Sequence, residues 1–280
     1  MSDIKNYHDL DADYLSLDKT FVRRTKNIQL IPTAANRKGG KIAYAEWAHV
    51  VGIFQTLLHA HLNDTTAPTI LDVGCGTGLL AIASQPFVQN TGRYIGIDVD
   101  SDAINFCNRH YREGNFEFLH LNTENAFYAP GQQKEQLAWP VVDETADMVT
   151  ALSVWTHFTP RDAHFYFNEV SRVLKPGGKA IITFFVLDAL YFDGVAARTD
   201  EAGTFHTLPQ NRWIFDQVCR DSGEFFYPTW VDVPEQAIAV TNAGLQKLVQ
   251  NASLTLLARH LGNWKEVPGL FFQDILVFQK

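Results

Sequence analysis

The sequence predicts an α/β protein with a doubly wound, mostly parallel sheet. Three observations support this fold class. Between residues 69 and 187, short apolar runs typical of buried strands alternate with segments of helical spacing. A glycine-rich stretch, GCGTG at residues 74–78, follows the first of these runs directly. It occupies the turn between the first strand and its helix, where doubly wound proteins bind nucleotides.

The composition limits the classes of protein to consider. The chain has 280 residues, 46% of them hydrophobic and 19% charged, which is enough apolar material for a sizeable core. Its formal net charge of −8 disfavours a nucleic acid partner, because Lys and Arg supply most of that affinity. Three cysteines without a CxxC pair fit neither a disulfide framework nor a metal site. Residues 1–10 hold no signal-peptide core and no apolar run could cross a membrane, so we expect a cytoplasmic protein.

The elements around the glycine stretch are predicted from their apolar spacing. Residues 44–62 form a helix, since their apolar side chains recur on one face. Residues 69–73 (TILDV) form the first strand, and the helix after the glycines ends near Pro86. The second strand covers residues 93–99, and the next helix has Ser101 as its N-cap.

Three more strands and one helix complete the predicted parallel sheet. The strands cover residues 116–121, 146–154 and 179–187, and the last contains the run AIITFFVL, which is typical of a strand buried on both faces. Residues 161–174 show helical spacing and end at the turn signal KPGG.

The chain after Asp188 follows a different pattern. Residues 188–234 are rich in aromatic and turn residues without a clear period, which predicts an insertion. A helix is expected at residues 243–251, followed by strands at residues 255–261 and 271–279. Because only a turn-rich stretch separates these two strands, we expect them to pair antiparallel.

The glycine stretch and two aspartates indicate the kind of ligand. A dinucleotide loop has the spacing G-x-G-x-x-G, whereas Gly74, Gly76 and Gly78 have the spacing G-x-G-x-G. Asp72 lies in the strand just before the loop and suits a ligand with a positive ammonium group better than a pyrophosphate. Asp98 ends the second strand, where a carboxylate can accept from both hydroxyls of a ribose. These features describe a nucleoside attached to an amino acid.

Four segments in this order resemble the successive motifs of the class I S-adenosylmethionine-dependent methyltransferases: LDVGCGTG, YIGIDVD, ADMVTALSVWTHF and EVSRVLKPGG. The resemblance covers residues 69–187 and includes a subgroup of small stand-alone enzymes. It implies S-adenosylmethionine as cofactor and a Rossmann-like sheet of seven strands, mostly parallel with an antiparallel last strand. We expect a methyltransferase domain at residues 67–280, preceded by an N-terminal helical cap at residues 1–66, with residues 188–234 as a lid over the acceptor.

The resemblance also implies roles for individual residues around the cofactor. They are Asp72 at the methionine ammonium, Gly74, Cys75 and Gly76 along the methionine, Asp98 on the ribose, Val99, Asn122 and Thr123 around the adenine, and Ser153 near the sulfonium. Asn122 departs from the family, which often has an acidic residue there, although an amide oxygen also accepts from an amino group. For Cys75, a small buried residue in the loop is expected rather than a nucleophile.

Two questions stay open on the acceptor side, each with two interpretations. His157 follows the fourth strand and is either the catalytic general base for an acceptor hydroxyl or a lid residue that shapes the methionine pocket. A group of aromatic and histidine residues either lines an acceptor pocket or forms a small satellite core. Its members are Trp155, Tyr191, Phe192, His206, Trp213, Phe225, Phe226 and Tyr227.

The sequence thus predicts transfer of a methyl group to an O or N nucleophile of a small-molecule acceptor, such as a metabolite, a sugar or a natural product. A methyltransferase acting on a macromolecule and a binding protein without turnover are the alternatives, and the loop spacing opposes a nicotinamide oxidoreductase. The assembly is predicted as a monomer or a homodimer.

Overall fold

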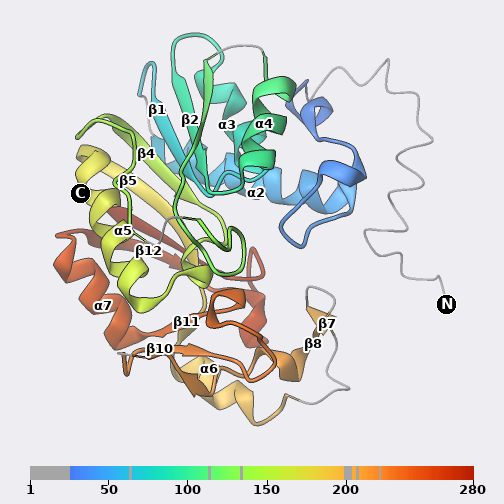
Figure 1. The fold of residues 1–280 in the computed structure, drawn as a ribbon, viewed down its shortest axis with the longest axis vertical. Coiled ribbons are helices and arrows are strands. Elements are labelled where there is room, and N and C mark those ends of the chain that lie inside the picture. The colour runs from blue at the N-terminus through green and yellow to red at the C-terminus, as the bar shows by residue number, and fades with distance from the viewer. Residues whose placement is uncertain are drawn as a thin grey trace.

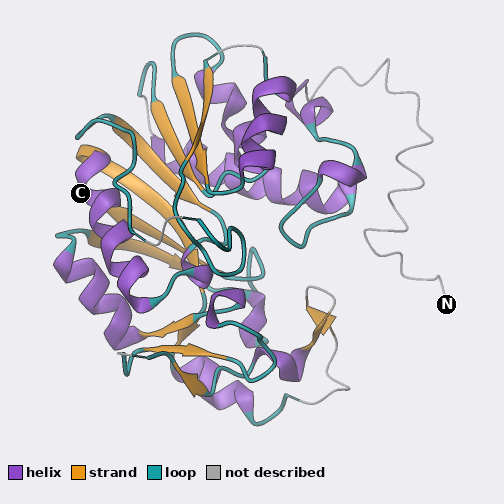
Figure 2. Ribbon diagram, in the orientation of Figure 1, coloured by secondary structure: helices purple, strands orange, loops and turns teal. Residues whose placement is uncertain are grey.

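A seven-stranded sheet forms the centre of the protein (Figures 1 and 2). The computed structural model describes residues 26–62, 65–112, 115–132, 135–198, 204–205, 208–220 and 222–280, so residues 1–25 of the predicted cap lie outside the described part. The strands of the sheet are β1 (Thr69–Val73), β2 (Arg93–Asp98), β3 (Phe116–His120), β4 (Ala146–Ala151), β5 (Leu174–Phe184), β12 (Thr255–His260) and β13 (Asp274–Gln279).

The strand order is β12-β13-β5-β4-β1-β2-β3. The strands from β3 to β5 pair in parallel, whereas β13 pairs antiparallel with both β5 and β12. The predicted doubly wound sheet of seven strands with an antiparallel last strand is therefore confirmed. Strands β2 and β3 extend the sheet on one side of β1, whereas β4 and β5 extend it on the other side. The order of the strands therefore reverses between β1 and β4, and this position is the topological switch point of the sheet.

Helices cover both faces of the sheet (Figure 1). The first face packs against α2 (Tyr44–Leu62), α3 (Leu79–Val88) and α4 (Ser101–His110), and the second against α5 (Pro160–Val173) and α7 (Asn242–Asn251). Successive strand residues alternate between the two cores, as a parallel sheet buried on both faces requires: Ile70 belongs to the first and Leu71 to the second. No helix in the described ranges has both the length and the apolar character needed to cross a membrane.

The strands predicted at residues 146–154 and 179–187 end earlier, at Ala151 and Phe184. Two other predicted boundaries are wrong for local reasons. The N-cap of α4 is Asp100 and not Ser101, because the Asp100 side chain accepts from the backbone N–H groups of Asp102 and Ala103. The KPGG turn does not end α5. Instead, Leu174 already begins β5 and leaves the helix in an extended conformation.

The aromatic segment after β5 contains a second, smaller sheet. Its order is β6-β11-β10-β9, and its strands are β6 (Val186–Leu187), β11 (Ala239–Thr241), β10 (Phe225–Tyr227) and β9 (Gln217–Val218). Other elements of the chain are α6 (Ala189–Val195), the hairpin β7 (Thr204–Phe205) and β8 (Leu208–Pro209), and the 3₁₀ helices η2 (Lys26–Leu30), η3 (Ala34–Asn36), η4 (Trp155–His157), η5 (Gln210–Trp213), η6 (Pro234–Gln236) and η7 (Asn263–Lys265). In Figure 1 the small sheet lies beyond the carboxyl ends of the parallel strands.

Candidate functional site

The glycine loop brings the turns after β1 and β4 into contact. Gly74 and Gly78 have positive φ angles of 66° and 91°, which disfavour any side chain. A Cβ on Gly74 would lie 2.5 Å from Cγ2 of Val154, and one on Gly78 would lie 2.4 Å from the ring of Tyr111. The loop therefore needs glycine at both positions, and its close approach to Val154 occurs at the switch point between β1 and β4.

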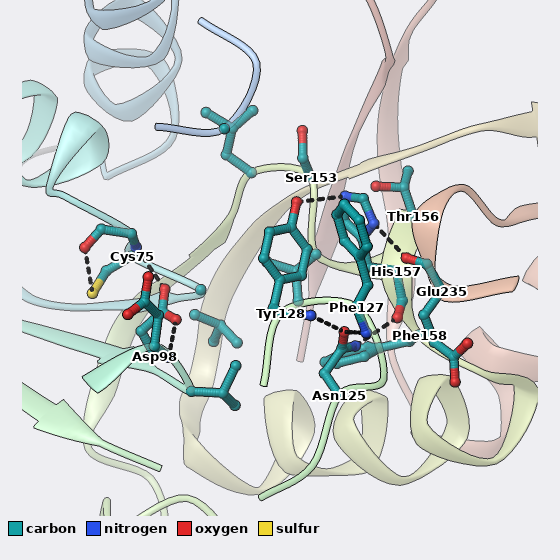
Figure 3. Close-up of a pocket in the computed structure, with 18 of the residues that line it drawn as sticks. Cys75, Asp98, Asn125, Phe127, Tyr128, Ser153, Thr156, His157, Phe158 and Glu235 are labelled. Carbon is teal, nitrogen blue, oxygen red and sulfur yellow. Dashed lines mark hydrogen bonds between the residues drawn. The ribbon is translucent and has the colours of Figure 1, made fainter. Parts of the chain in front are cut away.

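A cavity of about 630 Å³ opens at this switch point. Its lining comes from the loops after β1, β2, β3 and β4, from residues 38–41 before α2, and from the insertion. Figure 3 shows Cys75 and Asp98 at one end, and Tyr128, His157 and Glu235 at the other. We call these the glycine-loop end and the insertion end.

Asp98 presents a carboxylate at the glycine-loop end. Its Oδ2 accepts from the Gly76 N–H at 2.6 Å and its Oδ1 accepts from the Asp100 N–H at 2.8 Å. Burial raises the pKa of this carboxyl despite these two bonds. Since a carboxylate offers about four acceptor positions, each oxygen can accept one more hydrogen bond.

Asp72 is buried below the loop and ties three strands together. Tyr94 on β2 donates to its Oδ2 at 2.5 Å, and Thr150 on β4 donates to its Oδ1 at 2.9 Å. Only 1% of Asp72 is exposed, and this burial raises the pKa of its carboxyl to about 7. Its neighbour Cys75 is also buried, and burial raises the pKa of its thiol well above the usual value, which keeps the sulfur protonated.

Most of the other predicted cofactor residues meet in the same cavity. Val99, Thr123 and Ser153 line it. Thr123 is buried and donates to the Glu135 carbonyl at 2.9 Å. Asn122, in contrast, is exposed and lies outside the lining, so the structure does not bring it together with the others.

Ser153 is held in a specific conformation at the end of β4. Its φ angle is 59°, its N–H donates to the Thr183 hydroxyl at 2.7 Å, and its own hydroxyl donates to Oε1 of Gln273 at 2.9 Å. The turn after β4 is thereby fixed to β5 and to the segment before β13.

His157 joins three segments at the insertion end (Figure 3). Its Nδ1 lies 2.7 Å from the carbonyl oxygen of Glu235, which can only accept, so Nδ1 carries the proton. Its Nε2 is then an acceptor and lies 3.3 Å from the hydroxyl of Tyr128. The Tyr128 ring meets the imidazole edge-on at 5.0 Å, and Phe127 stacks on it at 6.2 Å.

Burial also determines the charge of His157. Burial, together with the smaller effect of the positive charge of Lys41, lowers the pKa of the imidazole to about 4, although the hydrogen bond to the Glu235 carbonyl opposes this shift. The ring is therefore neutral at neutral pH.

The aromatic residues predicted on the acceptor side do not lie together. Trp213 lines the cavity, whereas Trp155, Tyr191 and Phe225 are buried in the cores and Phe192 is exposed. His206 lies outside the described residues. The satellite core predicted as one interpretation does exist, and its buried members are Phe185, Leu187, Tyr191, Trp213, Phe215, Ala237, Ala239, Trp264 and Phe272.

Several lining residues were not predicted from the sequence. They are Lys41, Tyr128, Trp230, Glu235 and Gln273. None belongs to a motif, and each reaches the cavity only through the packing of distant segments.

The part of the chain that carries the motifs also matches known proteins. Residues 70–178 match the profile of the family described as "Methyltransferase domain". The fatty-acid O-methyltransferase of Mycolicibacterium smegmatis is 30% identical over 123 residues, which cover 43% of this chain and 38% of the relative. The ubiquinone/menaquinone biosynthesis C-methyltransferase UbiE of Enterobacter sp. is 26% identical over 166 residues, which cover 57% of each chain. The chain thus spans less than two thirds of the length of either relative.

A solved structure shows the same fold. The magnesium protoporphyrin IX methyltransferase from Synechocystis PCC 6803, solved with bound SAH, superimposes with a TM-score of 0.51 and 15% identity. The match covers 94% of this chain and 100% of the other.

Proposed function

Residues 70–178 of this chain belong to the methyltransferase-domain family, as the four motifs predicted, and from this premise we propose that the protein is an S-adenosylmethionine-dependent methyltransferase. We propose an O nucleophile, or alternatively an N nucleophile, on a small-molecule acceptor such as a metabolite, a sugar or a natural product. The two relatives are named for oxygen and carbon methylation of small molecules, and the first agrees with the nucleophile proposed here.

The observation that carries the proposal is the free acceptor capacity of Asp98 beside an open loop. Each Asp98 oxygen holds one backbone hydrogen bond and can accept another, which suits the two hydroxyls of a ribose. A Cβ placed on Gly76 would meet nothing within 4 Å, so the loop leaves space beside this carboxylate. The residues present therefore fit the cofactor.

When bound, S-adenosylmethionine supplies an electrophilic methyl group on a sulfonium. The chain's own contribution is to hold and orient the reactants and to exclude water, which is how most of the rate of such a displacement is achieved. Asp98 would hold the ribose, Val99 and Thr123 the adenine region, and Asp72 would lie near the methionine ammonium, with a carboxyl that is partly ionised at neutral pH because its pKa is about 7. Trp213 and Trp230 also line the cavity, and we propose that the acceptor lies against them.

Titration calorimetry tests this proposal directly. The wild-type protein should bind S-adenosylhomocysteine and should not bind NAD. Asp98→Ala should weaken the binding of S-adenosylhomocysteine by about 2–4 kcal/mol, the contribution of two hydrogen bonds to a charged group. Asp102→Ala is a matched control, because this aspartate is exposed and lies outside the cavity lining.

Two results would contradict the proposal. Binding of NAD in place of S-adenosylhomocysteine would overturn the choice of cofactor. Normal binding of S-adenosylhomocysteine to a folded Asp98→Ala variant would show that this carboxylate does not hold the ribose.

A further inference from the structure

Lys41 is a buried cation in the wall of the cavity. It lies just before α2, lines the cavity, and is only 4% exposed. Within the described chain, the one hydrogen bond of its ammonium goes to the Gly39 carbonyl at 3.1 Å, and no carboxylate approaches within 4.0 Å. Burial lowers the pKa of this ammonium to about 8, although the charge of Glu46 opposes the shift. A buried ammonium with unused donors is costly unless a ligand pairs with it.

The other cations of the lining are either exposed or held in an ion pair. Lys38 forms an ion pair with Asp100 at 2.6 Å, and its side chain is 49% exposed. Arg161 is exposed to solvent. Among the lysine and arginine side chains of the described lining, Lys41 alone combines burial with the absence of an ion pair.

The charge of Lys41 acts on the insertion end of the cavity. Its Nζ lies 5.5 Å from the centre of the Phe271 ring, next to Phe272 and Gln273 in the cavity wall. Its charge lowers the pKa of His157. At the glycine-loop end, by contrast, the charges that act on the pKa of Asp72 and Asp98 are those of neighbouring acids.

The cavity that Lys41 lines favours a monoanion on an apolar body. Trp213 packs against Phe272 at 5.1 Å and against Trp230 at 5.9 Å, so the three rings form one aromatic wall, and Lys41 supplies one point charge. A phosphate dianion would need more donors or a bidentate arginine, whereas one ammonium matches one carboxylate. Figure 3 shows the Glu235 carboxylate directed away from His157, so the insertion end does not present it to the imidazole.

The weak basicity of His157 agrees with an acceptor that is already ionised. A neutral imidazole with a pKa of about 4 is a weak base, and its Nε2 already faces the Tyr128 hydroxyl. An alcohol would have to lose a proton to such a base, whereas a carboxylate has none to lose.

We propose that the methyl acceptor is an apolar carboxylic acid whose carboxylate binds to Lys41, and that the product is its methyl ester. This inference rests on the proposed methyltransferase function. A carboxylate oxygen forms the new bond to the methyl carbon, while the sulfur–methyl bond breaks and its electron pair stays on sulfur. The sulfonium and the carboxylate are both neutralised, and no proton is transferred. The neutral ester then has no charge for Lys41 to hold, which favours its release.

Binding of paired acid and amide probes tests the role of Lys41. The probes are decanoate and 2-naphthoate, each compared with its primary amide, titrated into protein saturated with S-adenosylhomocysteine. The wild type should bind each acid about tenfold or more tightly than its amide, the effect of one charge-assisted hydrogen bond. Lys41→Met should lose this preference and keep its affinity for S-adenosylhomocysteine within about twofold. Lys247→Met, which removes a surface lysine paired with Glu224, should behave as the wild type.

The pH dependence of binding gives an independent measurement. With a pKa of about 8, the Lys41 ammonium falls to about a tenth of its population at pH 9, so acid binding should weaken about tenfold between pH 7 and pH 9. The titratable groups that face Lys41 are Glu46 and His157, and His157 stays neutral throughout this range. The Lys41→Met variant and the amide probes should show no such change.

Three results would overturn this inference. The first is equal binding of acid and amide by the wild type. The second is an acid preference that survives in Lys41→Met. The third is a loss of S-adenosylhomocysteine affinity in that variant, which would assign Lys41 to the carboxylate of the cofactor. Failure of the wild type to bind S-adenosylhomocysteine would instead refute the proposed function, so the two failures are distinct.

Discussion

Replacing Asp72 with asparagine should remove a large pH dependence of stability. The carboxyl of Asp72 has a pKa of about 7 in the folded protein and an ordinary value of 3.8, and burial is the main cause of the difference. Because the folded pKa is raised, the unfolded chain loses this proton first as the pH rises. The stability from this group is therefore present at low pH and is lost between about pH 4 and pH 7. At about 1.4 kcal/mol for each pH unit, the whole loss is about 4 kcal/mol.

Urea denaturation of wild type and Asp72→Asn at pH 5 and pH 8 measures this effect. Asparagine has nearly the same shape and can bond to both the Tyr94 and Thr150 hydroxyls, but it does not ionise. Between the two pH values, the wild type should lose about 2.5 kcal/mol of unfolding free energy relative to the variant. Asp102→Asn, at an exposed aspartate, should show no such difference. An equal gap between wild type and Asp72→Asn at both pH values would refute the argument, because it would mean that Asp72 keeps one charge state.

Two further substitutions test the packing around the cavity. Gly78→Ala should destabilise the protein by about 1–3 kcal/mol in urea denaturation, because φ is 91° and the new Cβ would lie 2.4 Å from the Tyr111 ring. An unchanged denaturation midpoint would show that the loop does not require glycine at this position. Lys265→Met should cost about 3–5 kcal/mol, since Lys265 is 1% exposed and its Nζ lies 2.8 Å from carboxylate oxygens of both Asp188 and Asp274. A loss of under about 1 kcal/mol would show that this buried network does not stabilise the link between the insertion and the sheet.

The main sheet could be predicted from the sequence because its strands are long apolar runs with clear ends. The first strand was predicted with its observed bounds, and β2 and β3 to within one residue. The error at α4 has a simple cause. Asp100 and Ser101 are both good N-cap residues, and only the observed path of the chain shows that the Asp100 carboxylate reaches two N–H groups.

The small sheet could not be predicted because its strands are too short to show a period. Its strands β9 and β10 have two and three residues, and β6 pairs with β11 across more than fifty positions of the chain, Val186 opposite Val240. A period of two needs at least four residues to be recognised. The aromatic content alone therefore indicated an insertion without indicating its architecture.

The glycine-loop end was easier to predict than the insertion end, because its residues follow strands that are long enough to be recognised in the sequence. Asp72 and Asp98 have their positions fixed by strands that the sequence defines. Asn122 lies beyond the end of β3, where Leu121 and Thr123 turn inward and the residue between them turns to solvent. Lys41 carries no sequence signal, since it is buried beside Phe271, which lies near the other end of the chain.

The hydrogen bonds of His157 bear on the choice between a base and a lid residue. Both ring nitrogens are engaged, Nδ1 with the carbonyl of Glu235, which directly follows the insertion, and Nε2 with the Tyr128 hydroxyl of the loop after β3. One residue earlier, the Thr156 carbonyl accepts from the Ile238 N–H at 2.7 Å, so the turn after β4 has two bonds to the segment that connects the insertion to β11. A protonated imidazole could not accept from Tyr128, and the low pKa of His157 keeps the ring in the form that can. We therefore infer that His157 positions the turn after β4 against the acceptor wall. This role leaves proton removal unassigned, and an acceptor that is already a carboxylate does not require it.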